Sequence, residues 1–253
     1  MNASLFLIVL LALAGHSCAF FWLWAEGKNF KTLGFKIYSE TWTNAQLKRE
    51  IFNSIWTPIH AIVALGFYYS RIFSGQGLVS FVYSLLLTYI WGEIFHYYSH
   101  VLFHKPKFLW IHEEHHKSKV CTPFTAISFS FSEKIVFSVG IFALPALLGL
   151  FFPVNFSGVC TWYLGYLVVN SFGHANFEIR GPAFLNKAGK KATSSIYHAL
   201  HHSRYVKNYG LGTRVLDQKH GTEWTDYEAV YTQVVVEGKP LDKLTTRIKN
   251  VRK

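Results

Sequence analysis

The segment Glu93–His116 reads EIFHYYSHVLFHKPKFLWIHEEHH, and further along the chain the segment His198–His202 reads HALHH. The five-residue pattern HxxHH therefore occurs twice, once as His112–His116 and once as His198–His202. Two more histidines four residues apart, His100 and His104, precede the first copy. Residues four apart share one face of a helix, so this pair forms a stripe. The repetition in distant segments predicts that these histidines converge on one site.

The spacing of these histidines suits metal ligation. In HxxHH we expect the first two histidines to face the same way and the third to lie about 100° further round the helix, so that one turn serves two neighbouring ions. Imidazole suits iron, zinc, copper or nickel, and eight or more ligands suit two ions better than one. The HxxxH pair and the two clusters supply eight imidazoles: His100, His104, His112, His115, His116, His198, His201 and His202.

The remaining histidines differ in how strongly the sequence indicates that they bind metal. His174 ends the fifth apolar segment in SFGHANFE, on the side where the clusters are expected, and is a ninth candidate ligand. Glu178, one turn later, is a carboxylate ligand, a hydrogen-bond acceptor for a ligand, or a solvated residue. His96 shares the stripe of His100, although the pattern is complete without it. We interpret the isolated histidines as polar residues at the level of the lipid head groups: His16, His60 and His220.

The composition indicates a membrane protein with basic loops. The chain of 253 residues is 51% hydrophobic and only 15% charged, yet its formal charge is +11. A soluble nucleic-acid-binding protein would carry more charged residues, so we expect no nucleic-acid partner. The three cysteines have no paired spacing, which argues against a disulfide framework or a cysteine-based zinc site.

Five apolar segments approach the length of about 20 residues that a bilayer crossing needs. We expect Pro58 and Pro145 to kink these helices rather than abolish them. The first segment has no basic residues before it and no clear cleavage site after it, so we expect a retained helix rather than a signal peptide. The last two segments are joined by a turn and predict a helical hairpin. The five segments cover residues 5–24, 51–73, 78–98, 135–154 and 156–172.

The basic residues indicate the orientation, because loops rich in Lys and Arg stay cytoplasmic. They lie between the first two segments (Lys28, Lys31, Lys36, Lys48, Arg49), after the third (Lys105, Lys107, Lys117, Lys119) and beyond the fifth. This places the N-terminus outside and the polar tail from Gly173 in the cytoplasm. We therefore predict an all-α integral membrane bundle of four to five membrane helices, with a helical cytoplasmic cap enclosing a di-metal centre. Residues 1–75 would form N-terminal membrane helices with a basic loop, and residues 76–253 a catalytic domain.

Over roughly residues 85–225 the chain resembles the fatty acid hydroxylase and sterol desaturase superfamily of membrane di-iron enzymes. The resemblance rests on the order HxxxH, HxxHH, lone His, HxxHH. Glu93, Trp110 and Glu133 fit flanking family positions, and Asn208-Tyr209-Gly210 and Asp217 with Gly221-Thr222 resemble the family's NYG and D…GT signature. Two departures are Val101, where the family commonly has Arg, and Leu216, where a Trp is frequent.

The resemblance implies a site and a reaction. Two iron ions would use O2 to hydroxylate or desaturate a C–H bond of a lipid, such as a sterol or fatty acyl chain, with no catalytic residue beyond the ligands and no other cofactor site. Glu93, Asn208 and Asp217 would support the site. The implied ligands are His100, His104, His112, His115, His116, His174, His198, His201 and His202.

The implied partners follow from the same resemblance. The chain has no GxGxxG nucleotide motif and no haem module, so electrons would come from an external donor. The basic face either docks an acidic carrier of the cytochrome b5 or ferredoxin type or merely reflects the positive-inside rule. The expected location is the bacterial inner membrane or the endoplasmic reticulum, as a multi-pass protein with its active site on the cytoplasmic side.

Three other interpretations remain open at this level. A metal-handling membrane protein or transporter would have a histidine-lined site without oxygenase activity, although transport sites usually lie near the bilayer midplane. An inactive protein could retain the scaffold, against which the complete ligand set argues. Zinc could replace iron, since imidazole accepts both ions.

Overall fold

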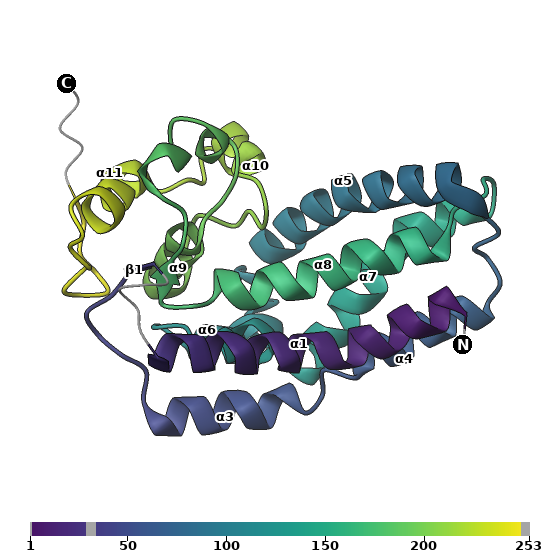
Figure 1. Cartoon of the computed structure of the whole chain (residues 1–253), viewed down its shortest axis with the longest axis horizontal. Coiled ribbons are helices and arrows are strands. Elements are labelled where there is room, and N and C mark those ends of the chain that lie inside the picture. Colours follow the sequence, from purple (N-terminus) through teal and green to yellow (C-terminus); the bar gives the residue numbers. More distant parts are fainter. Residues whose placement is uncertain (1, 29–33, 249–253) are drawn as a thin grey trace.

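The apolar segments form long helices that run side by side in one bundle (Figure 1). The computed structural model describes residues 2–28 and 34–248. Within these residues, four helical stretches are long and apolar enough to cross a membrane: Ala3–Gly27, Asn44–Tyr69, Gly77–Phe103 and Phe131–Gly149. The prediction of an all-α bundle with four to five membrane helices is confirmed. The helices are α1 (Ala3–Lys28), α3 (Asn44–Ser54), α4 (Ile59–Tyr69), α5 (Gly77–Phe103), α7 (Phe131–Gly149) and α8 (Phe156–Gly173).

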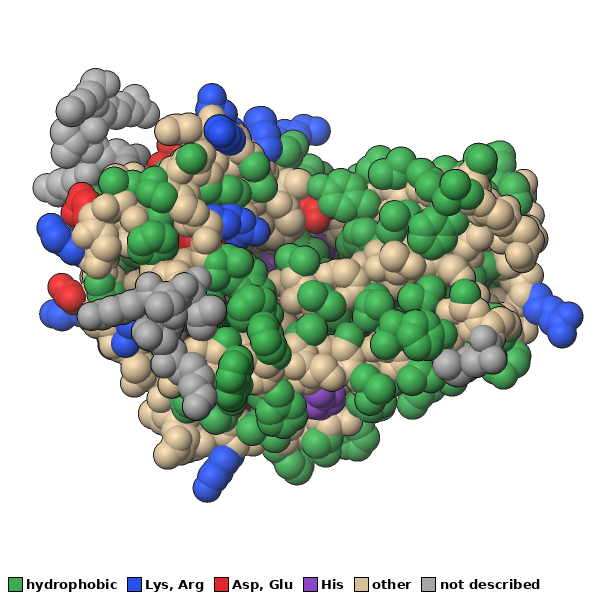
Figure 2. Space-filling model, viewed as in Figure 1, with side chains coloured by type: hydrophobic (Ala, Val, Ile, Leu, Met, Phe, Trp, Pro, Cys, Tyr) green, Lys and Arg blue, Asp and Glu red, His purple; other side chains and the backbone are tan. Residues whose placement is uncertain are grey.

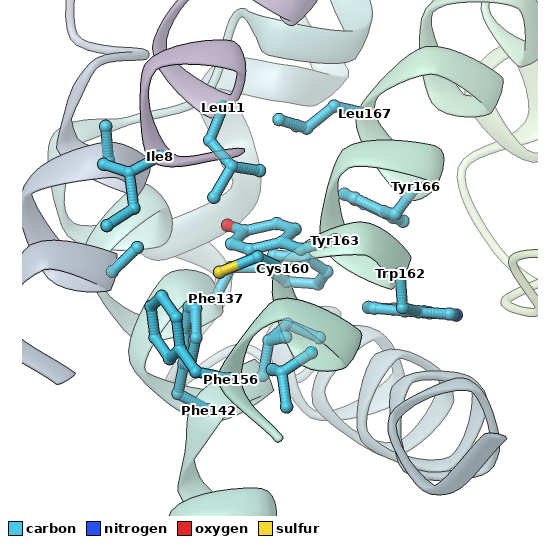
Figure 3. Packing of buried hydrophobic residues seen from close by; sticks show 14 of the residues in the cluster. Ile8, Leu11, Phe137, Phe142, Phe156, Cys160, Trp162, Tyr163, Tyr166 and Leu167 are labelled. Carbon is cyan, nitrogen blue, oxygen red and sulfur yellow. The ribbon is translucent and has the colours of Figure 1, made fainter. Parts of the chain in front are cut away.

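The fifth segment, α8, is the central helix of the bundle. It packs along α1 and α5, and its Cys160 and Tyr163 are fully buried. Figure 3 shows these side chains between Ile8 of α1 and Phe142 of α7. Its Val168 and Val169 are exposed on one side, so α8 packs on its neighbours over most but not all of its surface.

The second segment differs from the expected kinked helix. It forms two helices, α3 and α4, separated by a turn at residues 55–58. Pro58 is the residue before α4, where its missing N–H costs no helical hydrogen bond. Pro145, in contrast, lies inside α7 as expected.

The helices place all the histidine clusters at one end of the bundle. The chain starts at the opposite end, where Asn2 donates a hydrogen bond to the Tyr68 hydroxyl, and the cap with α9 to α11 lies at the other (Figure 1). At the starting end Gly75 donates a backbone hydrogen bond to Val154, which ties the α4–α5 connection to the α7–α8 turn. The clusters therefore share the end at which α5 and α8 finish.

A small cap covers that end. It contains α6 (Leu109–His116), α9 (Ser195–Arg204), α10 (Val215–His220) and α11 (Tyr227–Tyr231), with 3-10 turns at Pro123–Ile127, Pro182–Phe184 and Ala188–Lys190 and a π-helical turn at Thr232–Val236. The first loop also contributes, because β1 (Phe35–Lys36) pairs antiparallel with β2 (Phe177–Glu178). Ile37 and Tyr38 lie in the core of the cap beside Tyr197 and Tyr231. The N-terminal segment up to residue 75 thus supplies α1, α3 and α4 to the bundle and β1 to the cap. Lys31, one of the basic residues of the first loop, lies outside the described residues.

Candidate metal centre

The nine predicted histidines come together in two groups at the cap end of the bundle. In each group, one ring nitrogen per histidine lies within 4.8 Å of the chosen nitrogens of all the others. The five-histidine group contains His100, His104, His112, His116 and His201, and the four-histidine group contains His115, His174, His198 and His202.

The two HxxHH clusters interlock between the groups. His112 and His116 of α6 join the five-histidine group, whereas His115 joins the other. In α9 the assignment is reversed: the first and third histidines, His198 and His202, join the four-histidine group. The expectation that the first two histidines share a group is wrong. Four residues turn a helix by about 400°, which leaves the first and third only about 40° apart, against about 60° for the first and second.

The ring orientations present the Nε2 atoms toward one another. Backbone carbonyls fix the opposite nitrogen: Nδ1 of His174 lies 2.8 Å from the Asn170 oxygen, and Nδ1 of His202 lies 3.0 Å from the Ser118 oxygen. A nitrogen that faces a carbonyl carries the hydrogen, so each Nε2 of these two rings offers a lone pair. These two Nε2 atoms lie 2.8 and 3.1 Å from Nε2 of His198.

The five-histidine group has the same arrangement. Nδ1 of His201 lies 2.7 Å from the Lys207 oxygen, and its Nε2 lies 3.0 Å from Nε2 of His116. Several buried nitrogens here have no hydrogen-bond partner among the described residues, including Nε2 of His100 and both nitrogens of His104. An unsatisfied buried polar atom costs about 1–3 kcal/mol, and a bound cation would satisfy several such lone pairs at once. The donor set therefore fits a metal ion in each group.

Burial keeps these imidazoles in the form that binds metal. Removal from water lowers the pKa of His104 to about 3 and that of His174 to about 4. Burial also lowers the pKa of other members of both groups well below the ordinary value: His115, His116, His198, His201 and His202. A neutral ring has a free lone pair, which is what a metal ion requires.

The NYG signature forms the loop that orients two of the rings. Lys207 and Asn208 adopt left-handed backbone conformations, with φ of 67° and 55°. This turns the carbonyls of Lys207 and Tyr209 toward Nδ1 of His201 and His100. Asp217 holds the loop, because its carboxylate accepts hydrogen bonds from the backbone N–H groups of Tyr209 and Gly210. The signature residues thus act on the site through the backbone.

Carboxylates hold other parts of the site. Oε1 of Glu133 lies 2.5 Å from Nδ1 of His112, a contact that fixes the ring with Nε2 toward the group. Glu93 accepts hydrogen bonds from the backbone N–H groups of Gly212 and Thr213. Glu93 and Glu133 are the two acidic residues that fitted flanking positions of the family in the sequence analysis.

Glu50 was missed by the sequence analysis. Its buried carboxylate accepts hydrogen bonds from the hydroxyls of Ser118, Thr122 and Thr125, and so holds the segment after α6. That segment includes the Ser118 carbonyl, which faces Nδ1 of His202. A single acidic residue at the start of an apolar segment is the only signal that could have identified it.

The other candidates lie outside the two groups. Glu178 is buried and accepts hydrogen bonds from the backbone N–H groups of Arg180 and Ile196. His96 lines a cavity of about 20 Å³ beside both groups, together with Phe137 and Tyr166. Such a volume holds about one water-sized molecule.

The isolated histidines have separate environments. The head-group interpretation is wrong for His60, which is buried in the bundle with Nδ1 2.6 Å from the Tyr163 hydroxyl. Nε2 of His16 contacts the Ser54 hydroxyl at 3.0 Å. His220 is exposed beside Tyr98.

The fold and the site define a class of protein: a helical bundle of membrane-spanning length that ends in a histidine-rich centre able to hold two metal ions. The model of the fatty acid hydroxylase family matches residues 85–222, more than half of the chain. The chain belongs to this family, and the resemblance seen in the sequence is confirmed.

The curated relatives are considerably longer than this chain. Very-long-chain aldehyde decarbonylase CER1 of Arabidopsis thaliana is 28% identical over 156 residues, which are 58% of this chain and 24% of that protein. Very-long-chain aldehyde decarbonylase GL1-4 of Oryza sativa subsp. japonica is 30% identical over 51% of this chain and 22% of its own length. Fatty acid hydroxylase domain-containing protein 2 of Macaca fascicularis is 28% identical over 56% of this chain and 39% of its own length. No solved structure matches the chain significantly.

Proposed function

We propose that this protein is a membrane-bound di-iron oxidoreductase that uses O2 to hydroxylate or desaturate a C–H bond of a lipid. The observation that carries the proposal is the convergence of nine buried or partly buried histidines into two adjoining groups without a cysteine or a free carboxylate in either. All-imidazole sites accept iron, and family membership favours iron over zinc. The nine histidines are the proposed ligands.

The reaction needs two electrons from outside. In hydroxylation, a C–H bond, O2, two electrons and two protons give a C–OH group and one water molecule. In desaturation, two hydrogen atoms leave neighbouring carbons, and O2 with two electrons and two protons gives two water molecules. When bound, the two iron ions would supply the redox chemistry with O2.

The chain itself would position the ligands and exclude water. Glu133 and the carbonyls of Lys207, Ser118 and Asn170 hold the imidazoles with Nε2 inward. The small cavity beside His96 has mostly apolar walls, including Phe129, and its size suits O2. Exclusion of bulk water from so small a cavity would protect a reactive oxidant from side reactions.

The electron donor would be an acidic carrier of the cytochrome b5 or ferredoxin type. Lys105, Lys107, Lys117 and Lys119 are exposed and flank α6, which carries three of the proposed ligands. A carrier that binds these lysines would lie within a few residues of the centre, and complementary charge would speed its association. By the positive-inside rule this face is cytoplasmic.

Two measurements test this function. The protein purified from cells grown with iron is expected to contain two iron ions per chain. Lipid mass spectrometry of cells with and without the gene is expected to show a lipid that gains one oxygen or loses two hydrogens. Protein with full iron content but no lipid change under O2 and donor supply would favour the metal-handling alternative, and stable zinc occupancy without iron would contradict the di-iron proposal.

A further inference from the structure

The residue that ends α9 has an uncommon backbone conformation. Tyr205 is the C-cap of this helix, with φ of 71° in the left-handed region, and its N–H donates a hydrogen bond to the His201 oxygen. Gly or Asn usually occupies a left-handed position at the end of a helix, because the Cβ of a larger residue is strained there. Strained residues of this kind often lie at functional sites. We therefore examine what the Tyr205 side chain contacts.

The ring of Tyr205 lies directly on two members of the five-histidine group. Its centroid is 5.0 Å from that of His104 and 4.8 Å from that of His116, and both contacts are edge-to-face. Among the described residues, no ring contact joins Tyr205 to a member of the four-histidine group. The side chain is thus specific to one of the two groups.

Tyr205 covers the least buried part of the five-histidine group. His104 is partly exposed, whereas the other four members of the group are buried. Tyr205 is itself partly exposed, and no described residue forms a hydrogen bond with its hydroxyl. The contribution of the side chain at this place is therefore its ring, which covers His104 on the side of the cap.

The cap is also the side from which a hydrated ion can approach. Figure 2 shows Lys and Arg gathered on the cap, whereas the side of the bundle is largely hydrophobic. A hydrated cation does not cross such an apolar surface or the lipid around it without a large cost in free energy. An ion that reaches the centre is thus expected to pass through the cap.

A lysine holds the ring of Tyr205 in place. Nζ of the exposed Lys119 lies 4.8 Å from the centroid of this ring. A cation is attracted to the face of an aromatic ring, so the contact opposes displacement of Tyr205. The charge of Lys119 also repels a second cation nearby. Lys119 therefore acts against the passage of a metal ion in two ways.

We propose that Tyr205 closes the path by which a metal ion enters and leaves the five-histidine group from the cap. An ion that passes His104 and His116 has to displace the ring. The surroundings of the four-histidine group are different, because its partly exposed member, His198, lines a cavity of about 40 Å³ beside Arg180. The ions of the two groups then exchange with solution independently. This inference rests on the two-ion centre of the proposed function but not on its reaction with O2.

Release of iron to a chelator tests the proposal without turnover. Protein loaded with iron(II) is mixed with ferrozine in detergent under anaerobic conditions, and the coloured complex is followed with time. Tyr205→Gly is expected to release one of the two ions about tenfold faster and the other at the wild-type rate. Glycine suits the backbone conformation at this position, so the variant should fold. Tyr205→Phe keeps the ring and should release both ions as the wild type does.

The neighbouring residue provides the matched control. Val206 is 43% exposed, so Val206→Gly loosens the same loop without removal of the Tyr205 ring. It should release both ions at the wild-type rates. Equal release from Tyr205→Gly and the wild type, faster release of both ions, or equally fast release from Val206→Gly would overturn the proposal. Protein that binds fewer than two ions would instead contradict the proposed function.

The ion that leaves first can be located in crystals. After brief treatment of Tyr205→Gly crystals with the chelator, anomalous scattering should show the remaining iron in the four-histidine group. Iron that remains in the five-histidine group would contradict the assignment of the path.

The contribution of Lys119 is tested separately. Lys119→Gln is expected to speed release of the same ion about threefold, the size of effect expected for an exposed cation–π contact. Lys107, whose Nζ lies 5.7 Å from the centroid of the Phe108 ring, provides the control, and Lys107→Gln should not change the rate. An unchanged rate in Lys119→Gln would overturn the role assigned to this lysine.

Discussion

Two places in this protein bury histidine, and they differ in what surrounds the ring. In the bundle, Nδ1 of His60 lies 2.5 Å from the Ser138 hydroxyl and 2.6 Å from the Tyr163 hydroxyl. At the cap end, His198 lies between Nε2 of His174 and Nε2 of His202. A hydroxyl can donate to one ring nitrogen or accept from the other, so His60 is satisfied at Nδ1 by protein alone. The Nε2 atoms of His174, His198 and His202 face one another, so their lone pairs have no hydrogen-bond donor between them.

Burial alone therefore does not identify a histidine as a metal ligand. Both places hold buried histidines: His60 lies on α4 of the bundle, and most of the metal-site histidines lie on α6 and α9 of the cap. What separates them is the company of other imidazoles and the backbone carbonyls that turn each Nε2 inward. Substitution of a histidine in either metal group should therefore lower the bound iron, whereas substitution of His60 should not.

Loss of a proposed ligand should have the largest effect. His115→Ala and His201→Ala each remove one member of a group and leave the rest buried without a full ligand set. We expect each to lose bound iron and more than about a hundredfold of activity, because even residues that only support a ligand cost up to that amount. The protein should stay in the membrane, as membrane fractionation would show. Full iron content in either variant would contradict the ligand assignment.

Loss of a supporting carboxylate should have a smaller effect. Glu133→Gln keeps the size of the side chain but weakens the contact that orients His112. We expect metal affinity to fall about 10- to 100-fold in a chelator competition. Glu113→Gln, on the exposed face of α6 beside His112, is the control and should bind metal normally. An unchanged affinity in Glu133→Gln would mean that His112 needs no support.

A variant of the cap should change stability without changing the ligands. The Asp226 carboxylate forms two hydrogen bonds with the Arg204 guanidinium, at 2.7 and 2.9 Å, and both side chains are nearly buried. Asp226→Asn leaves Arg204 without its counter-charge and is expected to cost about 3 kcal/mol. Thermal unfolding in detergent, with and without bound metal, measures the loss. A melting temperature equal to that of the wild type would show that the cap does not depend on this pair.

The same ion pair predicts a pH dependence. Burial acts to raise the pKa of Asp226, but the hydrogen bonds and charge of Arg204 outweigh it and hold the pKa below its ordinary value. A group whose pKa is lower in the folded state stabilises the fold above its unfolded pKa, about 4 for Asp, and loses this contribution as pH falls through the folded value. The wild type should therefore lose this increment below about pH 4, and Asp226→Asn should lack it.

Replacement of the bundle histidine should have the smallest effect. His60→Phe leaves the Tyr163 hydroxyl without its 2.6 Å partner but removes no member of either group. We expect a loss of about 1–2 kcal/mol in thermal stability and an unchanged iron content. Loss of iron in His60→Phe would show that His60 contributes to the metal site, contrary to the distinction between it and the two histidine groups.

The spacing of residues predicted the main features of the site. The length of the apolar segments identified the helices. The two HxxHH clusters and the HxxxH pair identified eight of the nine histidines that the structure brings together, and the place of His174 after the fifth apolar segment identified the ninth. The flanking positions Glu93, Glu133 and Asp217 were also visible, because the family signature includes them. These features are local, so they appear in a single sequence.

The features that were missed depend on packing between distant segments. The packing of α6 against α9 decides which histidines of the two helices meet, so that His112 and His116 share a group with His201. Glu50 matters through a contact with Ser118, and β1 matters through pairing with β2. The position of α8 at the centre of the bundle likewise depends on the helices around it. A pattern within one short stretch of sequence does not show which distant segments pack against it.

Anomalous X-ray scattering at the iron absorption edge, from crystals of the iron-loaded protein, would locate the metal ions relative to the two histidine groups. We expect two iron peaks per chain, one among the ring nitrogens of His100, His104, His112, His116 and His201 and one among those of His115, His174, His198 and His202. A single peak shared by both groups, or iron bound elsewhere on the chain, would contradict it.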